Sequence, residues 1–423
     1  GIGGAGMSGL ALIARALGAE VTGSDRALSG PNLERLRAAG IEPRAGHAAE
    51  HVPAGAEVIY SSAVAPENPE RRVAASELHR ARLLGELTRL KPAICVSGTH
   101  GKTTTTSMVV HALRACGMDP AYSVGGEVRS TGTNAAWGAG EWLVVEADES
   151  DRSLLELDPT IAVVTNAELD HHATYASRRD VLETFAAFVA PARDVVVWDR
   201  PELRALRDRA VTTFDVACAD LRGGGVRFAL DGGTEVTLTI PGLHNALNAA
   251  AALAACRLAG ADVRTAAASL AGFTGAGRRF ERLGATAAGA VVIDDYAHHP
   301  TEVAATIAAA RTLEPAGRVV AVFQPHLFSR TAAEARAFGA ALAAADVAVV
   351  TGVYPAREYA EDFPGVTGLL VAEATADAGG AVAWMPSLED AEAYARGLLR
   401  QGDLCLTLGA GDVDAVGDRL VQG

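Results

Sequence analysis

The sequence lacks any apolar stretch long enough to cross a bilayer. Its longest apolar stretches are rich in alanine and broken by polar residues, and none reaches the roughly 20 residues that a spanning helix needs. It also lacks a basic segment leading into a hydrophobic core, so no export signal is predicted. The chain begins at Gly1 without a methionine, and we expect part of its first strand to precede this residue.

Positive charge is scarce relative to negative charge. The chain has 37 Lys and Arg against 51 Asp and Glu, a net charge of −14. This excess argues against a nucleic-acid partner held by bulk positive charge. An anionic ligand therefore has to be held by backbone amides, helix N-termini, a few basic side chains or metal ions.

Paired cysteines are also lacking. The five cysteines lie far apart and form no CxxC motif, which predicts reduced thiols in a cytoplasmic protein and excludes a disulfide or zinc framework. The content of 49% hydrophobic and 21% charged residues is typical of a globular protein. A length of 423 residues predicts two to four domains, with three the central expectation.

Short β-branched runs alternate with glycine turns and helical stretches, a pattern typical of βαβ units and parallel sheets. We predict an α/β protein with Rossmann-like first and third domains and a central P-loop ATPase-like domain with a mostly parallel sheet. Composition breaks place the domains at residues 1–90, 91–276 and 277–423. The predicted strands are residues 21–25, 58–62, 92–97, 141–148, 160–166, 194–199, 291–295, 319–324, 347–351, 382–385 and 404–408, with a hairpin at 226–240 and helices ending near residue 17 and spanning 245–258 and 262–270.

The strongest local signal is a glycine-rich turn between a predicted buried strand and a helix. It reads Ser-Gly-Thr-His-Gly-Lys-Thr-Thr over residues 97–104, and Val96 stands where the general GxxxxGK[ST] pattern has its first glycine. Glycines let successive N–H groups converge on phosphate oxygens, the lysine adds a charge, and the threonine hydroxyl can bind Mg²⁺. We predict that ATP is bound by Gly98, Thr99, His100, Gly101, Lys102, Thr103 and Thr104.

Two polar segments follow the next predicted strands. A carboxylate such as Glu146, at a strand end beside a phosphate loop, is placed to bind Mg²⁺, although a solvated acidic turn is the alternative. His171 and His172 follow the strand after that, where they fit a metal site, a phosphate donor or a helix start. Beside a phosphate loop, His171 is a candidate for a second metal ligand.

The first six residues fit the GxGxxG pattern, and Asp25 follows about 20 residues later, as in dinucleotide-binding folds. The same turn binds any diphosphate at a helix N-terminus, so no nicotinamide chemistry is implied. Asp25 fits either a ribose hydroxyl or a helix cap.

A pair of amides and a pair of arginines lie near the predicted domain junction. Asn245 and Asn248 share one helix face and can bind an adenine edge, unless Asn245 caps the helix. Arg278 and Arg279 fit a bound nucleotide or a salt bridge to Glu281.

In the last domain, two polar segments, 293–300 and 324–330, follow predicted strands. Their His, Tyr and Arg side chains should meet, because strand C-termini line the ligand crevice of open α/β sheets. An arginine fits a small carboxylate and a histidine can accept a proton, while a loop residue with a satisfied hydrogen bond is the alternative for each.

Together these motifs resemble the Mur ligase family along the whole chain, and the shortened phosphate loop is that family's own version. The resemblance rests on residues 1–9, 97–103, 146–151, 244–245, 294–300 and 324–326. It implies a three-domain, ATP- and Mg²⁺-dependent ligase of cytoplasmic peptidoglycan synthesis, monomeric or weakly dimeric. The expected substrates are UDP-N-acetylmuramate and L-alanine, joined through an acyl phosphate.

The resemblance also implies roles for individual residues. Lys102, His298 and Arg330 would be catalytic, with His298 a candidate base for the amine and Tyr296 or water as alternatives. The remaining expected contacts are Thr103, Glu146 and His171 for Mg²⁺; Asn245, Asn248, Arg279 and Asp295 for ATP; Gly3, Ala5, Gly6, Met7, Ser8, Asp25 and Ser62 for the UDP-sugar; and Tyr296, His298 and Arg330 for the amino acid. Leu327 departs from the family, whose members often have arginine there, so the amino-acid loop carries one fewer cation.

Three alternatives compete with this interpretation. A recycling ligase of the same family would attach a whole tripeptide to the same UDP-sugar. A nicotinamide-dependent oxidoreductase would account for Gly1–Gly6 but not for the phosphate loop. A regulatory P-loop ATPase would bind UDP-sugars without joining anything.

Overall fold

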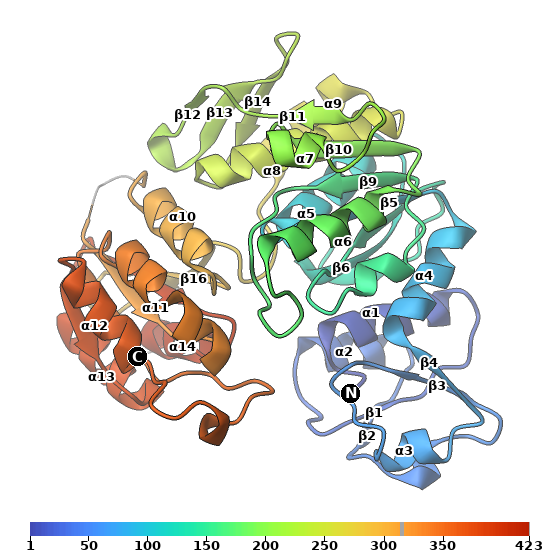
Figure 1. The fold of residues 1–423 in the computed structure, drawn as a ribbon, viewed down its shortest axis with the longest axis horizontal. Helices are drawn as coiled ribbons and strands as arrows, with labels where there is room; N and C mark the ends of the chain where they lie inside the picture. Colours follow the sequence, from blue (N-terminus) through green and yellow to red (C-terminus); the bar gives the residue numbers. More distant parts are fainter. Residues whose placement is uncertain (314–316, 423) are drawn as a thin grey trace. The chain divides into compact units, whose positions relative to one another are not determined.

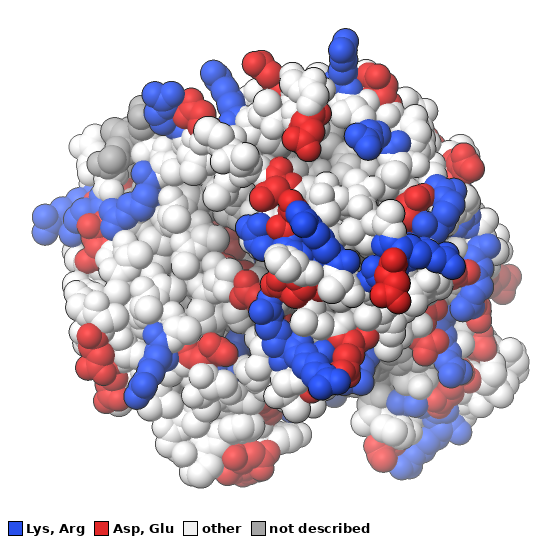
Figure 2. Space-filling view, turned by 45° about the horizontal axis from the view of Figure 1, so that its top comes forward, with Lys and Arg blue, Asp and Glu red and all other residues white. Residues whose placement is uncertain are grey.

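The protein is described by a computed structural model that covers residues 1–313 and 317–422 (Figure 1). The chain divides by its internal contacts into two units. The first comprises Gly1–Glu168, Ser177–Asp215 and Asn248–Leu270, and the second comprises Leu169–Ala176, Val216–Leu247 and the chain from Ala271 onward. Among the described residues, no helix combines the length and apolar character needed to cross a membrane. On the face drawn in Figure 2, basic and acidic side chains are interspersed.

The first unit is built on a sheet with the strand order β11-β10-β9-β5-β8-β6-β7. All pairs are parallel except β6 with β7, and β5 and β9 are buried along their whole length, as expected for strands covered on both faces. The strands are β5 (Ala93–Ser97), β6 (Ala121–Val128), β7 (Thr133–Ala136), β8 (Leu143–Glu146), β9 (Ile161–Val164), β10 (Asp194–Trp198) and β11 (Thr212–Phe214). The helices of this part are α5 (Lys102–Ala115), α6 (Arg178–Val189), α7 (Pro201–Arg204) and α9 (Val263–Ser269), and α8 (Leu243–Leu258) begins in the second unit and ends in the first.

The N-terminal part of the first unit keeps the predicted alternation of strands and helices, but its strands are short. They form two parallel pairs, β1 (Ser24–Asp25) with β2 (Arg44–Ala45) and β3 (Glu57–Tyr60) with β4 (Ser76–His79). The backbone N–H of Ile2 donates to the carbonyl of Ser24 over 2.9 Å, so the first residues run beside β1. The helices here are α1 (Ala5–Ala16), α2 (Pro31–Ala38), α3 (Pro69–Arg72) and α4 (Arg80–Leu90).

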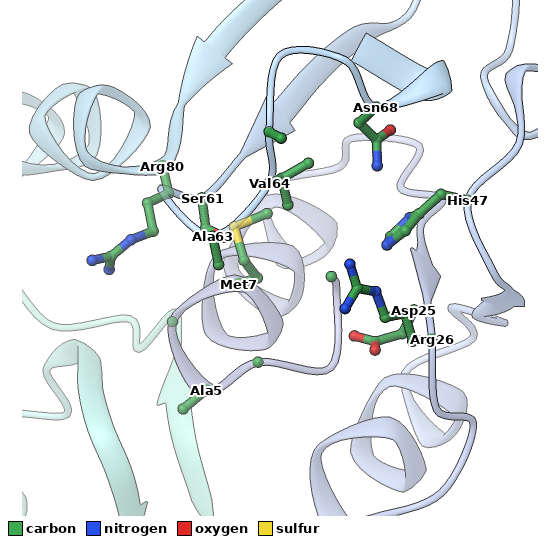
Figure 3. A pocket seen from close by; sticks show the side chains of 14 residues that line it. Ala5, Met7, Asp25, Arg26, His47, Ser61, Ala63, Val64, Asn68 and Arg80 are labelled. Atoms are coloured by element: carbon green, nitrogen blue, oxygen red, sulfur yellow. The ribbon is translucent and has the colours of Figure 1, made fainter. Parts of the chain in front are cut away.

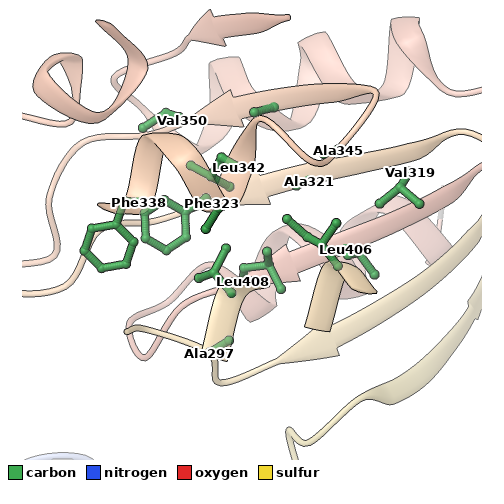
Figure 4. Packing of buried hydrophobic residues seen from close by; sticks show 14 of the residues in the cluster. Ala297, Val319, Ala321, Phe323, Phe338, Leu342, Ala345, Val350, Leu406 and Leu408 are labelled. Carbon is green, nitrogen blue, oxygen red and sulfur yellow. The ribbon is translucent and has the colours of Figure 1, made fainter. Parts of the chain in front are cut away.

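The second unit contains a sheet with the order β15-β16-β20-β17-β18-β19, parallel except for the pair β15–β16. Valine, alanine, leucine and phenylalanine side chains such as Phe323, Phe338 and Leu406 pack into one of its buried clusters (Figure 4). Its strands are β15 (Glu281–Ala285), β16 (Val291–Asp295), β17 (Val319–Phe323), β18 (Val347–Val350), β19 (Val382–Trp384) and β20 (Leu404–Leu408). Its helices are α10 (Pro300–Ala310), α11 (Phe328–Leu342), α12 (Leu369–Asp377), α13 (Leu388–Leu398) and α14 (Asp414–Gln422).

The predicted fold class and most predicted strands are confirmed. The hairpin is also confirmed, as β13 (Val226–Ala229) paired antiparallel with β14 (Glu235–Leu238) and extended by β12 (Ala219–Asp220). The predicted strand at 21–25 was too long, because only Ser24–Asp25 pairs. Strands β2, β4, β6, β7, β11, β12 and β15 were missed; β6, for example, contains Gly125 and Gly126, which weaken a strand signal. The division into three domains stays a prediction.

Candidate functional site

The glycine-rich turn lies between β5 and α5, as the sequence predicts. Gly98 and Gly101 adopt φ angles of 134° and 80°, and α5 begins at the next residue, Lys102. The Lys102 Nζ donates to the carbonyl oxygens of Gly98 over 2.7 Å and Thr99 over 3.1 Å, which curls the turn around the ammonium group. The side chain of Asn166 holds the turn from β9, accepting from the His100 N–H and donating to the His100 carbonyl. This arrangement has the geometry that a phosphate-binding loop at a helix N-terminus requires, and we refer to residues 97–104 as the phosphate loop.

A Gly98→Ala substitution should abolish ATP binding. A Cβ at this position would lie 2.0 Å from Thr165 Oγ1, on a backbone with a φ of 134° that side chains rarely adopt. Gly117→Ala is the matched control, because Gly117 also has a positive φ but nothing lies within 4 Å of its Cβ position. Isothermal titration with ATP and Mg²⁺ should show binding in Gly117→Ala only. Normal ATP affinity in Gly98→Ala would refute the assignment of this loop.

Two carboxylates, one at the end of β8 and one just after it, complete the surroundings of the loop. Glu146 accepts a hydrogen bond from Thr103 Oγ1 over 2.9 Å and from the backbone N–H of Gly125 over 2.6 Å. Glu149 is 2% exposed and lies 2.8 Å from Lys102 Nζ. Burial alone would lower the pKa of Lys102, but Glu149 and its acidic neighbours raise it, so the ammonium stays charged. Mg²⁺ prefers oxygen ligands, and the Thr103 hydroxyl oxygen and a Glu146 carboxylate oxygen lie 2.9 Å apart.

Of the other residues predicted for ATP and Mg²⁺, Asn248 belongs to the same unit as the loop and contacts it. A Cβ on Gly101 would lie 2.3 Å from Asn248 Oδ1, so this amide packs directly against the turn. Asn245 lies inside α8, where its side-chain amide donates to the Pro241 carbonyl over 2.7 Å. His171 belongs to the second unit, and its role as a metal ligand stays a prediction.

A cavity of about 580 Å³ opens above the N-terminal glycine turn (Figure 3). Of the residues predicted for the UDP-sugar, four line this cavity: Ala5, Gly6, Met7 and Asp25. Gly3 and Ser8 lie behind them and support the turn: the Gly3 N–H donates to Asp25 Oδ2 over 2.8 Å, and Ser8 Oγ donates to the Ala5 carbonyl over 3.0 Å. Ser61, not Ser62, lines the cavity, while Ser62 Oγ donates to Asp151 over 2.9 Å. The cavity has a size usual for small-molecule sites.

Sequence reasoning missed the basic side chains of this cavity. Arg26, His47 and Arg80 line it, and Arg80 lies 3.4 Å from Asp148 and 3.5 Å from Asp151. Each of the three comes within two residues of a strand's end: Arg26 after β1, His47 after β2 and Arg80 after β4. Arg26 follows a predicted strand, so its position was a usable signal, whereas β2 and β4 were not predicted and gave no such signal for His47 and Arg80.

The second unit brings together the aromatic and basic residues predicted after β16 and β17. The His298 ring lies edge-on to Tyr296, with ring centres 5.2 Å apart, and to His326, with ring centres 5.8 Å apart. The His326 ring stacks on Tyr354, with ring centres 5.7 Å apart. These residues follow β16, β17 and β18 and form one cluster, which we call the histidine cluster: Tyr296, His298, His326 and Tyr354.

Arg330 does not present an open cation to this cluster. Its side chain is 2% exposed and forms a two-pronged ion pair with Asp170, with Nε 2.9 Å from Oδ1 and Nη2 3.1 Å from Oδ2. Burial alone would raise the pKa of Asp170, but the Arg330 guanidinium lowers it, so the carboxylate is ionised. Sequence reasoning predicted Arg330 as a direct substrate contact and missed Asp170.

Both histidines of the cluster are neutral at pH 7. Burial lowers the pKa of His298 to about 3 and that of His326 to about 4, and Arg330 lowers both further. A group with a pKa of about 3 holds a proton poorly, which disfavours His298 as the final acceptor of an ammonium proton. A neutral imidazole can still accept a hydrogen bond from an amine.

The buried neutral state of His326 predicts a pH dependence of stability. Its pKa is about 4 in the fold and roughly 6.5 in the unfolded chain, so the unfolded state binds the proton more readily and stability falls as the pH drops below about 6.5. At pH 5 this contribution is about 2 kcal/mol. His326→Gln should therefore lose about 2 kcal/mol less than the original chain between pH 7.5 and pH 5 in urea unfolding. Burial raises the pKa of Asp295 to about 6, which makes the fold more stable, not less, as the pH drops. This contribution is the same in both chains and cancels in the comparison. Equal losses in the two chains would refute a buried neutral His326.

The residues predicted to close on the nucleotide lie beside this cluster in the second unit. Arg278 pairs with Asp294 over 2.9 Å, and Glu281 accepts from its backbone N–H rather than from its guanidinium. Arg279 lies 3.8 Å from Glu302. The buried Asp295 carboxyl accepts from the backbone N–H groups of Phe280 and Ala297, each over 2.8 Å, and so fixes the loops on either side of β16.

Comparison with known proteins gives a consistent result along the chain. Residues 1–91 match "Mur ligase family, catalytic domain", residues 96–256 match "Mur ligase middle domain", and residues 278–411 match "Mur ligase, glutamate ligase domain". The chain is 43% identical to the UDP-N-acetylmuramate–L-alanine ligase of Streptomyces griseus and 45% identical to that of Kineococcus radiotolerans. These alignments cover all of this chain and 96% and 94% of the two relatives.

Solved structures agree with these matches. The UDP-N-acetylmuramate–alanine ligase of Thermotoga maritima superposes with a TM-score of 0.84 at 29% identity, covering 100% of this chain and 97% of that one. A murein peptide ligase from Psychrobacter arcticus superposes with a TM-score of 0.72 at 24% identity, covering 100% and 97%, which shows a shared fold.

Proposed function

Because the chain belongs to the Mur ligase family, we propose that it joins L-alanine to the carboxylate of UDP-N-acetylmuramate with the use of ATP, in cytoplasmic peptidoglycan precursor synthesis. One observation carries the proposal: 43% identity over the full chain to an enzyme named for this reaction. In this proposal residues 1–90 bind the UDP-sugar, residues 91–276 bind ATP, and residues 277–423 supply the amino acid.

The phosphate loop supports the ATP part of the proposal. Backbone N–H groups of the loop and the Lys102 ammonium face the phosphate tail, and Thr103 and Glu146 would hold Mg²⁺, with His171 as a further ligand. Bound Mg²⁺ would offset negative charge on the phosphate oxygens. Asn245 and Asn248 of α8 would contact the adenine, and Arg279 and Asp295 would close on the nucleotide.

The chemistry follows from the poor reactivity of a carboxylate toward an amine. The muramoyl carboxylate attacks the γ-phosphorus and releases ADP, which leaves an acyl phosphate. The amine of L-alanine then attacks the acyl carbon, and phosphate departs. Lys102 and the loop amides stabilise the charge that develops on the phosphoryl group. Alignment of the reacting groups supplies about 7–11 kcal/mol of the barrier when the geometry is good.

The cavity of the first unit fits the UDP-sugar part. It combines a helix N-terminus at Ala5 with the cations Arg26 and Arg80, which suits a diphosphate. The histidine cluster, with Tyr296 and His298 directly and Arg330 behind it, would receive L-alanine.

Product mass tests the proposal directly. The chain is incubated with UDP-N-acetylmuramate, ATP, Mg²⁺ and one amino donor, either L-alanine or the tripeptide of the recycling ligases. A product heavier by one alanine residue, formed only with ATP, is expected. A product with the tripeptide alone would assign the recycling activity. ATP hydrolysis with neither product would refute ligation, and hydride transfer from NADH would identify an oxidoreductase.

A further inference from the structure

We propose that Asp148 and Asp151, two carboxylates in the segment that follows β8, are positioning residues for Arg80 of the N-terminal cavity. The proposal rests on the function proposed above, in which this cavity binds the UDP part of the sugar nucleotide. It adds two residues that lie outside the lining of the cavity. Arg80 stays the group that would touch the ligand phosphates.

Arg80 reaches the cavity from the first position of α4 (Figure 3). A Cβ on Gly6 would lie 3.2 Å from Arg80 Nη1, so the guanidinium lies directly against the N-terminal glycine turn. Helix α1 begins in this turn at Ala5, and the N–H groups in the first turn of a helix favour an anion. Nη1 of Arg80 therefore lies on the side of the cavity where phosphates would bind.

The other terminal nitrogen of Arg80 faces the two carboxylates. Nη2 lies 3.4 Å from Asp148 Oδ2 and 3.5 Å from Asp151 Oδ2. Each carboxylate is itself fixed, because Asp148 Oδ1 accepts from the Ser150 N–H over 2.9 Å and Asp151 Oδ1 accepts from the Ser153 N–H over 3.0 Å. A ligand that orders a long side chain loses affinity to the entropy of that ordering, and it loses less when the side chain is already held.

The turn that carries both carboxylates is also attached to the phosphate loop. Glu149, which lies between them in sequence, is 2% exposed and lies 2.8 Å from Lys102 Nζ. The Glu149 carbonyl accepts from the Arg152 N–H over 3.0 Å, which closes the turn. The turn thus contacts Lys102 through Glu149 and Arg80 through its two aspartates, so Arg80 has a fixed place relative to the phosphate loop within the first unit.

The two carboxylates have opposing effects on an anionic ligand of this cavity. Their charge repels the ligand phosphates, so by charge alone their removal would tighten the binding of UDP. Their hold on Arg80 acts in the other direction, because a released guanidinium has to be ordered by the ligand. The side chains of Asp148 and Asp151 are 37% and 25% exposed, so water screens the repulsion, and we expect positioning to dominate. The sign of the change in affinity therefore separates the two effects.

Calorimetric titration of the full chain with UDP and with uridine tests the proposal. Asp148→Asn/Asp151→Asn should weaken the binding of UDP by about three- to tenfold. The affinity for uridine should not change, because uridine has no phosphates for Arg80 to meet. In a chain that already carries Arg80→Ala, the same two changes should cause no further loss of UDP affinity, since they act only through Arg80.

Glu156→Gln is the matched control for these variants. Glu156 lies further along the same segment and pairs with Arg82 of α4 over 3.8 Å, outside the lining of the cavity. Its removal breaks a contact between the same two segments, and the affinity for UDP should match that of the original chain. A loss in Glu156→Gln equal to that in the aspartate variant would show that any contact between these segments has the effect, and it would overturn the proposal.

Other results would also overturn it. Unchanged or tighter binding of UDP in Asp148→Asn/Asp151→Asn would show that the carboxylates do not position Arg80. An equal loss for UDP and uridine would show a general change of the cavity instead. If the double variant does not fold, Asp151→Asn alone decides by the same criteria.

Failure of the proposed function gives a different result, because binding of UDP needs no turnover. A chain that forms no alanine product, yet loses UDP affinity selectively in the aspartate variant, keeps Asp148 and Asp151 as positioning residues. A chain that forms the product while UDP affinity is the same in the variant keeps the function and loses the proposal. No binding of UDP to the original chain would refute both the proposal and the assignment of the cavity.

Discussion

Lys102→Ala is expected to lower ATP-dependent phosphate release by a factor of about 10³ or more. Lys102 Nζ lies at the centre of the phosphate loop, where it contacts two loop carbonyls and the buried Glu149. In the proposed function this ammonium meets the outer phosphates, so its loss would leave the transferred phosphoryl group without its main protein cation. Stopped assays of phosphate and product with saturating substrates measure the effect.

The control for Lys102→Ala has to account for Glu149, the buried carboxylate that pairs with Lys102. Lys102→Ala alone leaves a 2% exposed carboxylate without its ammonium, and removing one partner of a buried pair costs about 3–5 kcal/mol. The double variant Lys102→Ala/Glu149→Gln removes that buried charge, so it should recover stability and stay inactive. The chain has one other lysine, Lys91, whose ammonium donates to the carbonyls of Gly138 and Gly140. Lys91→Ala should retain turnover, and turnover in the double variant would remove Lys102 from the mechanism.

Local patterns were sufficient to predict the glycine turn between β5 and α5. The strand, the glycine turn and the helix are consecutive in sequence, and the positive φ angles of Gly98 and Gly101 are a backbone property that glycine itself signals. The parallel sheets were predictable for the same reason, since β5, β9 and β17 are short, continuous apolar runs.

The contacts that orient the other site residues were not predictable from local patterns. Asp170 and Arg330 are 160 positions apart, and nothing near either residue in the sequence indicates that they pair. The sequence predicts Arg330 as a cation for a substrate carboxylate, which stays a prediction, and it gives no sign of the ion pair with Asp170. Arg80 was missed in a similar way, because only the pairing of β3 with β4 places it at the edge of the N-terminal cavity.

The second large effect is expected for Glu146→Gln. Glu146 joins the Thr103 hydroxyl to the Gly125 backbone N–H, and its charge is the feature that a divalent cation would require there. Glutamine keeps the shape of the side chain but loses the charge. We expect turnover to fall by about 10²–10³ and half-maximal activity to need about 10–100 times more Mg²⁺. Titration of activity against Mg²⁺ at constant ATP measures both changes.

Glu156→Gln provides the comparison for Glu146→Gln. Glu156 ends the short 3₁₀ helix Ser153–Glu156 and lies 3.8 Å from the exposed Arg82. Glu156→Gln is therefore the same substitution of glutamate by glutamine, made outside the loop. Its Mg²⁺ titration should match that of the original chain. Binding of ADP to Glu146→Gln, measured calorimetrically, should weaken with Mg²⁺ present and stay unchanged in EDTA, because only the metal-bound state uses the carboxylate. An unaltered Mg²⁺ dependence in Glu146→Gln would show that the cation is held elsewhere, and the hydrogen bonds of Glu146 to Thr103 and Gly125 would then serve only to shape the loop.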